Sequence, residues 1–243
     1  MEQDQGRGWL TGLCVSALMV TGLLAVWLVM DPETLYRAFD HEGRSVMERV
    51  TLLFYGAIVP FVWWKCPFTG SPVRRRLLCA AVSLVAVMAI VKQTDSHLVV
   101  MQTLYPDVVA NFKGTPFKMR FLTSSVVPLG AKAVSLSYFI LFFGVFAGLL
   151  AFYAVPLIRG AFSFHPVAWT MGCFGATGVM VQLCDRMPAW IRHARGLAKT
   201  AEIDGTRALF TALEEGGELL LAVLALMAIA QAHALYREKS QDV

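Results

Sequence analysis

Three carboxylates stand within one helical turn at the start of an apolar run. The stretch TALEEGGELLLAV contains Glu214, Glu215 and Glu218, and the chain then stays apolar almost without interruption to Ala230. Glu218 shares a helix face with both of the others, because residues three and four apart are neighbours on a helix. Three like charges that leave water together repel one another, so we expect at least one to keep its proton or to meet a cation. The candidate cations are a metal ion or the side chains of Arg49, Lys92, Arg186 and Arg207.

A carboxylate and an imidazole stand two residues apart in the stretch KQTDSH, as Asp95 and His97. Such a pair can bind a divalent metal or act as a base and an acid. In isolation it is more typical of a solvated aspartate beside an interfacial histidine, and only the glutamates favour the chemical interpretation. If the pair meets the glutamates, the predicted catalytic and metal-binding residues are Asp95, His97, Glu214 and Glu218. The predicted supporting residues are Glu48, Asp185 and Glu215, and the residues predicted to bind an anionic headgroup are Lys92 and Arg186.

The composition indicates a membrane protein. Of the 243 residues, 57% are hydrophobic and 16% are charged, and the mean hydropathy is +0.59, which is far more apolar than a soluble domain. A helix needs about 20 apolar residues to cross a hydrocarbon core. The sequence therefore predicts an all-α chain with a single transmembrane domain over residues 1–243. Its six spans are expected at about 9–30, 45–64, 75–92, 131–157, 166–184 and 208–236.

The connection between the third and fourth spans is too long and too apolar for a plain loop. We expect one short interfacial or re-entrant helix near 96–111, a break at Gly114-Thr115-Pro116, and a second short amphipathic piece. Two stretches, KGTPFKMR and RMPAWIRHARGLAK, mix cations with large apolar side chains. This mixture is typical of segments that lie at a lipid surface, so membrane lipids are the expected contacts.

Several classes of function find no support in the sequence. The five cysteines contain no C-x-x-C pair, so neither a disulfide framework nor a structural zinc site is implied. Basic tracts interleaved with aromatic residues are missing too, so we expect no nucleic-acid partner. No glycine-rich phosphate loop, nucleophile elbow or cofactor fingerprint occurs. The stretches GVFAG and GCFGATG place small residues on helix faces, where they favour close helix packing within the bundle. The alternative is close packing against a membrane protein partner.

Six spans place both termini on one side of the membrane. Most lysines and arginines fall on the opposite side, but many of those lie in long connections, which count less than short loops. The short loop KCPFTGSPVRRR carries a compact basic cluster. We therefore expect a multi-pass protein of a bacterial inner membrane with cytoplasmic termini, and we expect the carboxylates and Asp95-Ser96-His97 at the non-cytoplasmic face.

Short motifs in a fixed order support a bacterial source. They are RSVMERVTLL, KQTDSH, FKMRF followed by VPLGAK, the pair DR after the fifth span, and EEGGE. Together they resemble a pattern found in uncharacterised bacterial inner-membrane proteins, and this resemblance implies no particular activity. The chain differs from the alkaline-ceramidase-like membrane hydrolases, because it lacks their paired-histidine H-x-x-x-H helix.

Three functions remain open at this stage. The first is a metal-dependent enzyme that acts on a lipid or lipid-linked substrate at the non-cytoplasmic face. The second is an accessory or scaffold membrane protein whose polar network only holds helices together. The third is a proton- or cation-coupled transporter that uses the three glutamates, although no internal inverted repeat is visible.

Overall fold

The computed structural model describes residues 8–39, 45–66, 68, 70–112, 119–194, 196 and 205–241. These residues form helices and no strand, and six of the helices are long and apolar enough to cross a membrane. The all-α class and the six helices of spanning length are thus confirmed. Their bounds are α2 (Leu10–Val29), α4 (Val46–Lys65), α5 (Pro72–Gln93), α9 (Leu129–Phe162), α10 (Pro166–Ala194) and α11 (Gly205–Gln241).

Local hydrogen bonds explain where α4 and α5 begin. The Ser45 hydroxyl accepts a hydrogen bond from the Glu48 amide at 3.0 Å, and the Glu48 carboxylate accepts one from the Ser45 amide at 3.3 Å. This capping box satisfies two backbone donors at the helix start. The Ser71 hydroxyl caps α5 with one hydrogen bond, which it accepts from the Arg74 amide at 3.3 Å, and Pro72 occupies the first helical position, where its missing N–H costs nothing.

A short helix between the first two spans, α3 (Pro32–Phe39), is not among the predicted elements. Its first residue is a proline, and the Asp31 carboxylate accepts a hydrogen bond from the Thr34 amide at 2.9 Å. Hydrogen bonds from the side chain and backbone of Thr34 lower the pKa of Asp31 below its ordinary value. Leu35 and Phe39, four residues apart, are buried and fix the inner face of α3.

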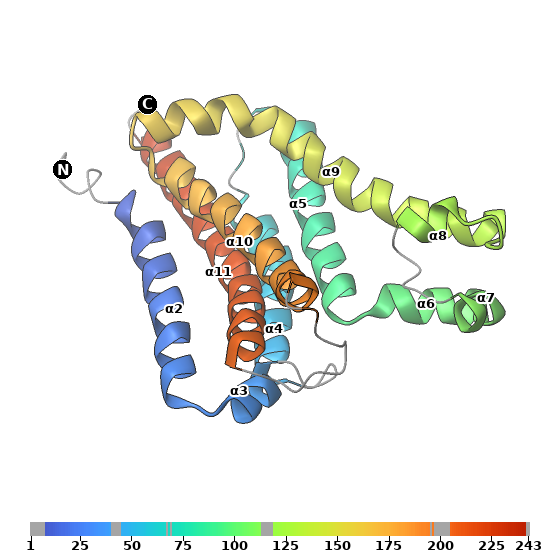
Figure 1. The fold of residues 1–243 in the computed structure, drawn as a ribbon. Coiled ribbons are helices and arrows are strands. Elements are labelled where there is room, and N and C mark those ends of the chain that lie inside the picture. Colours follow the sequence, from blue (N-terminus) through green and yellow to red (C-terminus); the bar gives the residue numbers. More distant parts are fainter. Residues whose placement is uncertain are drawn as a thin grey trace.

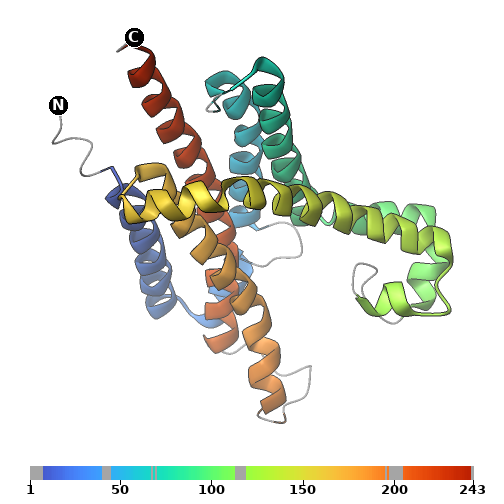
Figure 2. The same cartoon turned by 90° about the horizontal axis from the view of Figure 1, so that it is seen from above.

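Three short helices fill the connection between the third and fourth spans: α6 (Ser96–Leu104), α7 (Pro106–Asn111) and α8 (Met119–Thr123). With the start of α9 they form an arm that extends to one side of the other long helices in both views (Figures 1 and 2). The arm has a hydrophobic core of its own, built from Met101, Phe121, Val127 and Ala131. The expected break at Gly114-Thr115-Pro116 lies outside the described residues.

Helix α11 is the central helix of the bundle. It contributes residues to three separate hydrophobic clusters: Ala208 and Ala212 pack with α2 and α3, Leu220 and Leu224 with α10, and Ala222 and Ile229 with α4 and α5. Its start is tied to α2 and α3, because Trp27 donates to the Gly205 carbonyl at 2.9 Å and Arg207 donates to the Tyr36 hydroxyl at 3.0 Å.

The opposite end of α11 is tied to α10 and α4. Thr170 donates to the Gln231 side chain at 2.8 Å, and the His233 ring donates to the Lys65 carbonyl at 2.6 Å. The start of α2 and the end of α11 lie at this same end of the bundle, whereas α3 lies at the other end (Figure 1). The six long helices therefore return the chain to the end at which it started.

The glycine pair of α11 allows two neighbouring helices to pack closely against it. A Cβ atom on Gly216 would lie 2.5 Å from Leu23 of α2, and one on Gly217 would lie 2.5 Å from Val181 of α10. Both distances are far shorter than a normal carbon–carbon contact. The two glycines beside the glutamates are thus required by packing on both sides of the helix.

This packing predicts that Gly217→Leu destabilises the protein. The added side chain overlaps Val181, and overpacking of this kind costs about 1 to 3 kcal/mol. Gly172→Leu on α10 is the matched control, because no described atom lies within 4 Å of its Cβ position. Thermal unfolding of the purified protein in detergent should show a lower Tm for Gly217→Leu alone. Equal Tm values for the two variants would contradict the close contact.

Candidate functional site

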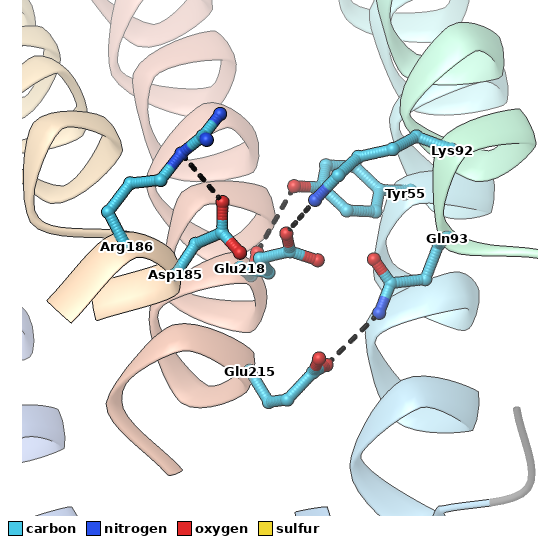
Figure 3. Close-up of polar contacts among 7 residues, drawn as sticks. All are labelled: Tyr55, Lys92, Gln93, Asp185, Arg186, Glu215 and Glu218. Atoms are coloured by element: carbon cyan, nitrogen blue, oxygen red, sulfur yellow. Dashed lines mark hydrogen bonds and ion pairs between the residues drawn. The ribbon is translucent and has the colours of Figure 1, made fainter. Parts of the chain in front are cut away.

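The deepest of the three carboxylates forms an ion pair with a lysine of another helix. Glu218, on α11, pairs with Lys92 in the last turn of α5 (Figure 3). The Glu218 side chain is only 7% exposed, whereas that of Lys92 is 49% exposed. Lys92 thus meets an enclosed carboxylate although about half of its own side chain is exposed. Of the cations named as candidates for this carboxylate, Lys92 is the one that meets it.

Two further hydrogen bonds surround this ion pair. The Gln93 side-chain amide donates to the Glu215 carboxylate at 3.2 Å, and the Tyr55 hydroxyl donates to the Glu218 backbone carbonyl at 3.2 Å (Figure 3). The three contacts join α4, α5 and α11 at one level of the bundle. We refer to Tyr55, Lys92, Gln93, Glu215 and Glu218 as the polar junction.

Two other acidic candidates, Glu48 and Glu214, lie near the polar junction. Glu48 caps the start of α4, and its charge also acts on Glu215. The charge of Glu214 acts on Lys92 and on Cys184 of α10. Both residues therefore add negative charge near the polar junction, where Lys92 supplies the amine that pairs with Glu218.

Asp185 and Arg186 pair with each other on α10. The Arg186 Nε atom lies 3.3 Å from Asp185 Oδ2, and both side chains are about half exposed or more. An ion pair between exposed neighbours contributes about 0 to 1 kcal/mol to stability. Arg186 is thus bound to its own neighbour, whereas Lys92 holds Glu218.

Asp95 and His97 lie on the turn from α5 into α6. Asp95 has a left-handed backbone, with φ of 50°, a conformation that aspartate tolerates better than most residues. The His97 Nδ1 atom lies 3.3 Å from the Val91 carbonyl oxygen, and its ring stacks on Tyr138 of α9 with centroids 5.1 Å apart. The contacts described for this pair run to α5 and α9, and they help redirect the chain into the arm.

A metal centre at these residues stays a prediction. In the described part of the chain, no three His, Cys, Asp or Glu side chains gather closely enough to hold a metal ion. A cavity of about 220 Å³ lies elsewhere, in the arm, where Asp107, Asn111 and Phe112 line it with Val108, Val126 and Val127. It contains none of the residues expected to do chemistry.

No protein family, curated protein or solved structure matches this chain. The resemblance to bacterial inner-membrane proteins therefore stays a prediction. The function has to be argued from the fold and from the polar junction alone.

The sequence analysis missed two members of the polar junction. Tyr55 and Gln93 carry no charge and belong to no motif, so no pattern singles them out. One signal was present: Gln93 is adjacent to Lys92 at the end of an apolar helix, where an amide and an amine together are rare enough to suggest a polar contact inside the bundle.

The geometry predicts unequal effects for the two halves of the ion pair. Glu218→Ala should destabilise the protein by about 3 kcal/mol, the lower end of the range for a broken buried pair, because Lys92 is half exposed. Lys92→Met should cost more, because it leaves a carboxylate that is 7% exposed without its partner. The double variant Lys92→Met/Glu218→Ala should lose less than the sum of the two single variants. Chemical or thermal unfolding of all three variants gives these values.

Asp185→Ala is the matched control for these variants, since it removes a carboxylate from an exposed pair. Its effect should stay below about 1 kcal/mol. Additive losses in the double variant, with no recovery, would show that Lys92 and Glu218 act independently.

Proposed function

We propose that this chain is a multi-pass membrane protein without a catalytic centre, and that it binds a transmembrane helix of a partner protein along α9. The observation that carries the proposal is the pair Gly144 and Gly148. Both glycines are exposed, and no described atom lies within 4 Å of either Cβ position. Glycine costs about 1 kcal/mol relative to alanine inside a helix. In membranes, two glycines four residues apart offset that cost by letting a second helix approach closely.

The rest of α9 supports the same use. The helix has 34 residues, and none of its most apolar 18-residue window is buried. At about 1.5 Å per residue it is about 51 Å long, compared with the roughly 30 Å of a hydrocarbon core. It also runs obliquely to the other long helices (Figure 2). Such a helix presents a long apolar surface to its surroundings.

The polar junction supports a structural use of the carboxylates. The amine of Lys92 already meets the most buried glutamate, and Gln93 donates to a second one. These contacts join helices, as expected of a network that fixes packing. In this proposal the junction keeps α5 in place, and α5 in turn carries the arm and the beginning of α9.

We place the protein in a bacterial inner membrane, with both termini in the cytoplasm. The arm helices α6, α7 and α8 then lie on the non-cytoplasmic surface, where Val99, Val100 and Leu104 are exposed and available to lipid. The support for this orientation is the basic loop between α4 and α5.

Cysteine labelling tests the orientation. A cysteine introduced at Asp107 should react with a membrane-impermeant maleimide added to intact cells, and Cys66 should react only after the cells are opened. The background for the Asp107 probe replaces the five native cysteines by serine. Labelling of Cys66 in intact cells would invert the arrangement.

Photocrosslinking tests the partner helix. A photoreactive amino acid at Val145, between the two glycines, should give one discrete adduct with another membrane protein in native membranes. Gly144→Leu/Gly148→Leu should abolish that adduct, because two bulky side chains keep the helices apart. The Tm of the purified protein should stay unchanged, since both glycines face open space.

The same probe beside Gly56 of α4 is the control, because Gly56 also faces open space but has no glycine partner one turn away. An adduct of the size of a dimer would show that α9 associates with a second copy. No adduct at all, or equal adducts at both positions, would contradict a partner-binding face on α9.

A metal-dependent enzyme acting on a lipid is the second candidate. The excess of carboxylates over the single lysine favours it, since Glu214, Glu215 and Glu48 act on the same region. Its predicted ligands are Asp95, His97, Glu214 and Glu218, which would have to move closer together to hold a divalent cation. A stoichiometric metal in the purified protein that is lost in His97→Ala would support this function. A metal-free protein whose cellular role survives His97→Ala would remove it.

A further inference from the structure

Two cysteines from different helices meet at the turn between α4 and α5. Cys66 is the residue after the last turn of α4, and Cys79 lies within the early part of α5. The Cys79 thiol donates toward the Cys66 sulfur over a distance of 3.8 Å. A disulfide bond needs about 2.05 Å between sulfurs, so the two sulfur atoms are in contact but not bonded.

The surroundings hold both sulfurs in place. The Cys79 thiol also lies 3.6 Å from the Val62 carbonyl, an acceptor in the last turn of α4. Cys66 has a left-handed backbone, with φ of 38°, which directs the chain out of the helix. The preceding carbonyl, that of Lys65, accepts a hydrogen bond from His233 at 2.6 Å. The turn is thus anchored to α11 on one side and to α5 on the other.

The two thiols differ in solvent exposure, as expected if one cysteine reacts with the oxidant first and the other reacts second. Cys66 is half-buried, whereas Cys79 is 1% exposed. A small oxidant from solution therefore reaches Cys66 first. Cys79 lies behind it, within reach of the oxidised sulfur.

An arginine lies beside the more accessible thiol. Cys66 is the group that acts most strongly on the Arg75 guanidinium. The Arg75 Nε atom is buried and has no hydrogen-bond partner in the described structure. A guanidinium in this position can pair with a thiolate, which is the form of cysteine that attacks oxidants.

We propose that Cys66 and Cys79 form a redox-active dithiol that closes to a reversible disulfide on reaction with a peroxide. The Cys66 thiolate attacks one oxygen of hydrogen peroxide, which breaks the O–O bond and leaves a sulfenic acid on Cys66 and a hydroxide that is protonated to water. The Cys79 sulfur then attacks the Cys66 sulfur, forms the S–S bond and releases a second water. Overall, two thiols and one peroxide give one disulfide and two waters. A low-molecular-weight thiol reverses the reaction by exchange.

The bond joins the end of α4 directly to α5, across a turn that α11 also holds. It therefore fixes the α4–α5 pair in the oxidised form. This site is separate from the polar junction and from Gly144 and Gly148 of α9, so its test is independent of the proposed function.

The test uses the full-length protein, purified in detergent under reducing conditions and then treated with hydrogen peroxide. Intact mass should fall by two hydrogen atoms, and two of the five cysteines should no longer react with maleimide when the treated protein is denatured. Peptide mapping should find the bond between Cys66 and Cys79, and dithiothreitol should restore both thiols. Cys14→Ser/Cys173→Ser/Cys184→Ser should behave as the wild type, because it retains the pair.

Arg75 variants add a second measurement. Arg75→Gln should slow disulfide formation, and Arg75→Lys should restore most of the rate, because the reaction needs the positive charge and not the shape of the guanidinium. Five thiols that still react with maleimide after the peroxide-treated, folded protein is denatured would overturn the proposal. So would oxygen atoms added to Cys66 without a disulfide, or a bond that involves any other cysteine.

Discussion

The ion pair between Lys92 and Glu218 is the interaction on which the arrangement of α5 depends. An amine and a carboxylate attract each other strongly where water is scarce, but each loses hydration when it enters the protein. The loss of hydration is smaller for Lys92 than for Glu218. Glu218 is enclosed, whereas the Lys92 stem lies partly exposed, so the lysine keeps some contact with its surroundings. The pair is thus directional: α11 supplies a buried anion, and α5 ends at the point where its amine can reach that anion.

The position of the ion pair links the bundle to the arm. Lys92 and Gln93 are the last residues of α5 before the turn at Asp95, which starts α6. Through that turn the polar junction determines where the arm helices leave the bundle, and His97 fixes the turn against Tyr138 of α9. The arm has its own hydrophobic core. A change at Glu218 should therefore first alter the position of the arm. Gly144 and Gly148 of α9 would move with it.

The sequence was sufficient to predict the class of fold, because a long apolar run is a local property. Residues 9–30 contain no charge, and helix α2 occupies almost the same range. The same local logic could have found α3, whose Asp31-Pro32 start and buried Leu35 and Phe39 are ordinary helix signals.

The partner of Glu218 could not be chosen from the sequence among several cations, since charge alone does not say which helix lies opposite. Arg186 was as plausible as Lys92, and only the packing of α5 against α11 distinguishes them. Cys66 and Cys79 are a further case: thirteen residues apart and without a motif, they meet because α4 and α5 form a hairpin.

Chemical crosslinking between the two positions of the ion pair tests the central claim most directly. In a background without native cysteines, Lys92→Cys/Glu218→Cys should be joined within one chain by a short bifunctional thiol reagent in native membranes, because the reagent spans the gap that the lysine and glutamate side chains fill in the wild type. Lys92→Cys/Leu221→Cys is the control, since Leu221 points toward Gly178 of α10. The account predicts a crosslink in the first variant and none in the second. Equal crosslinking in both variants, or a crosslink in the control alone, would contradict the placement of α5 against α11.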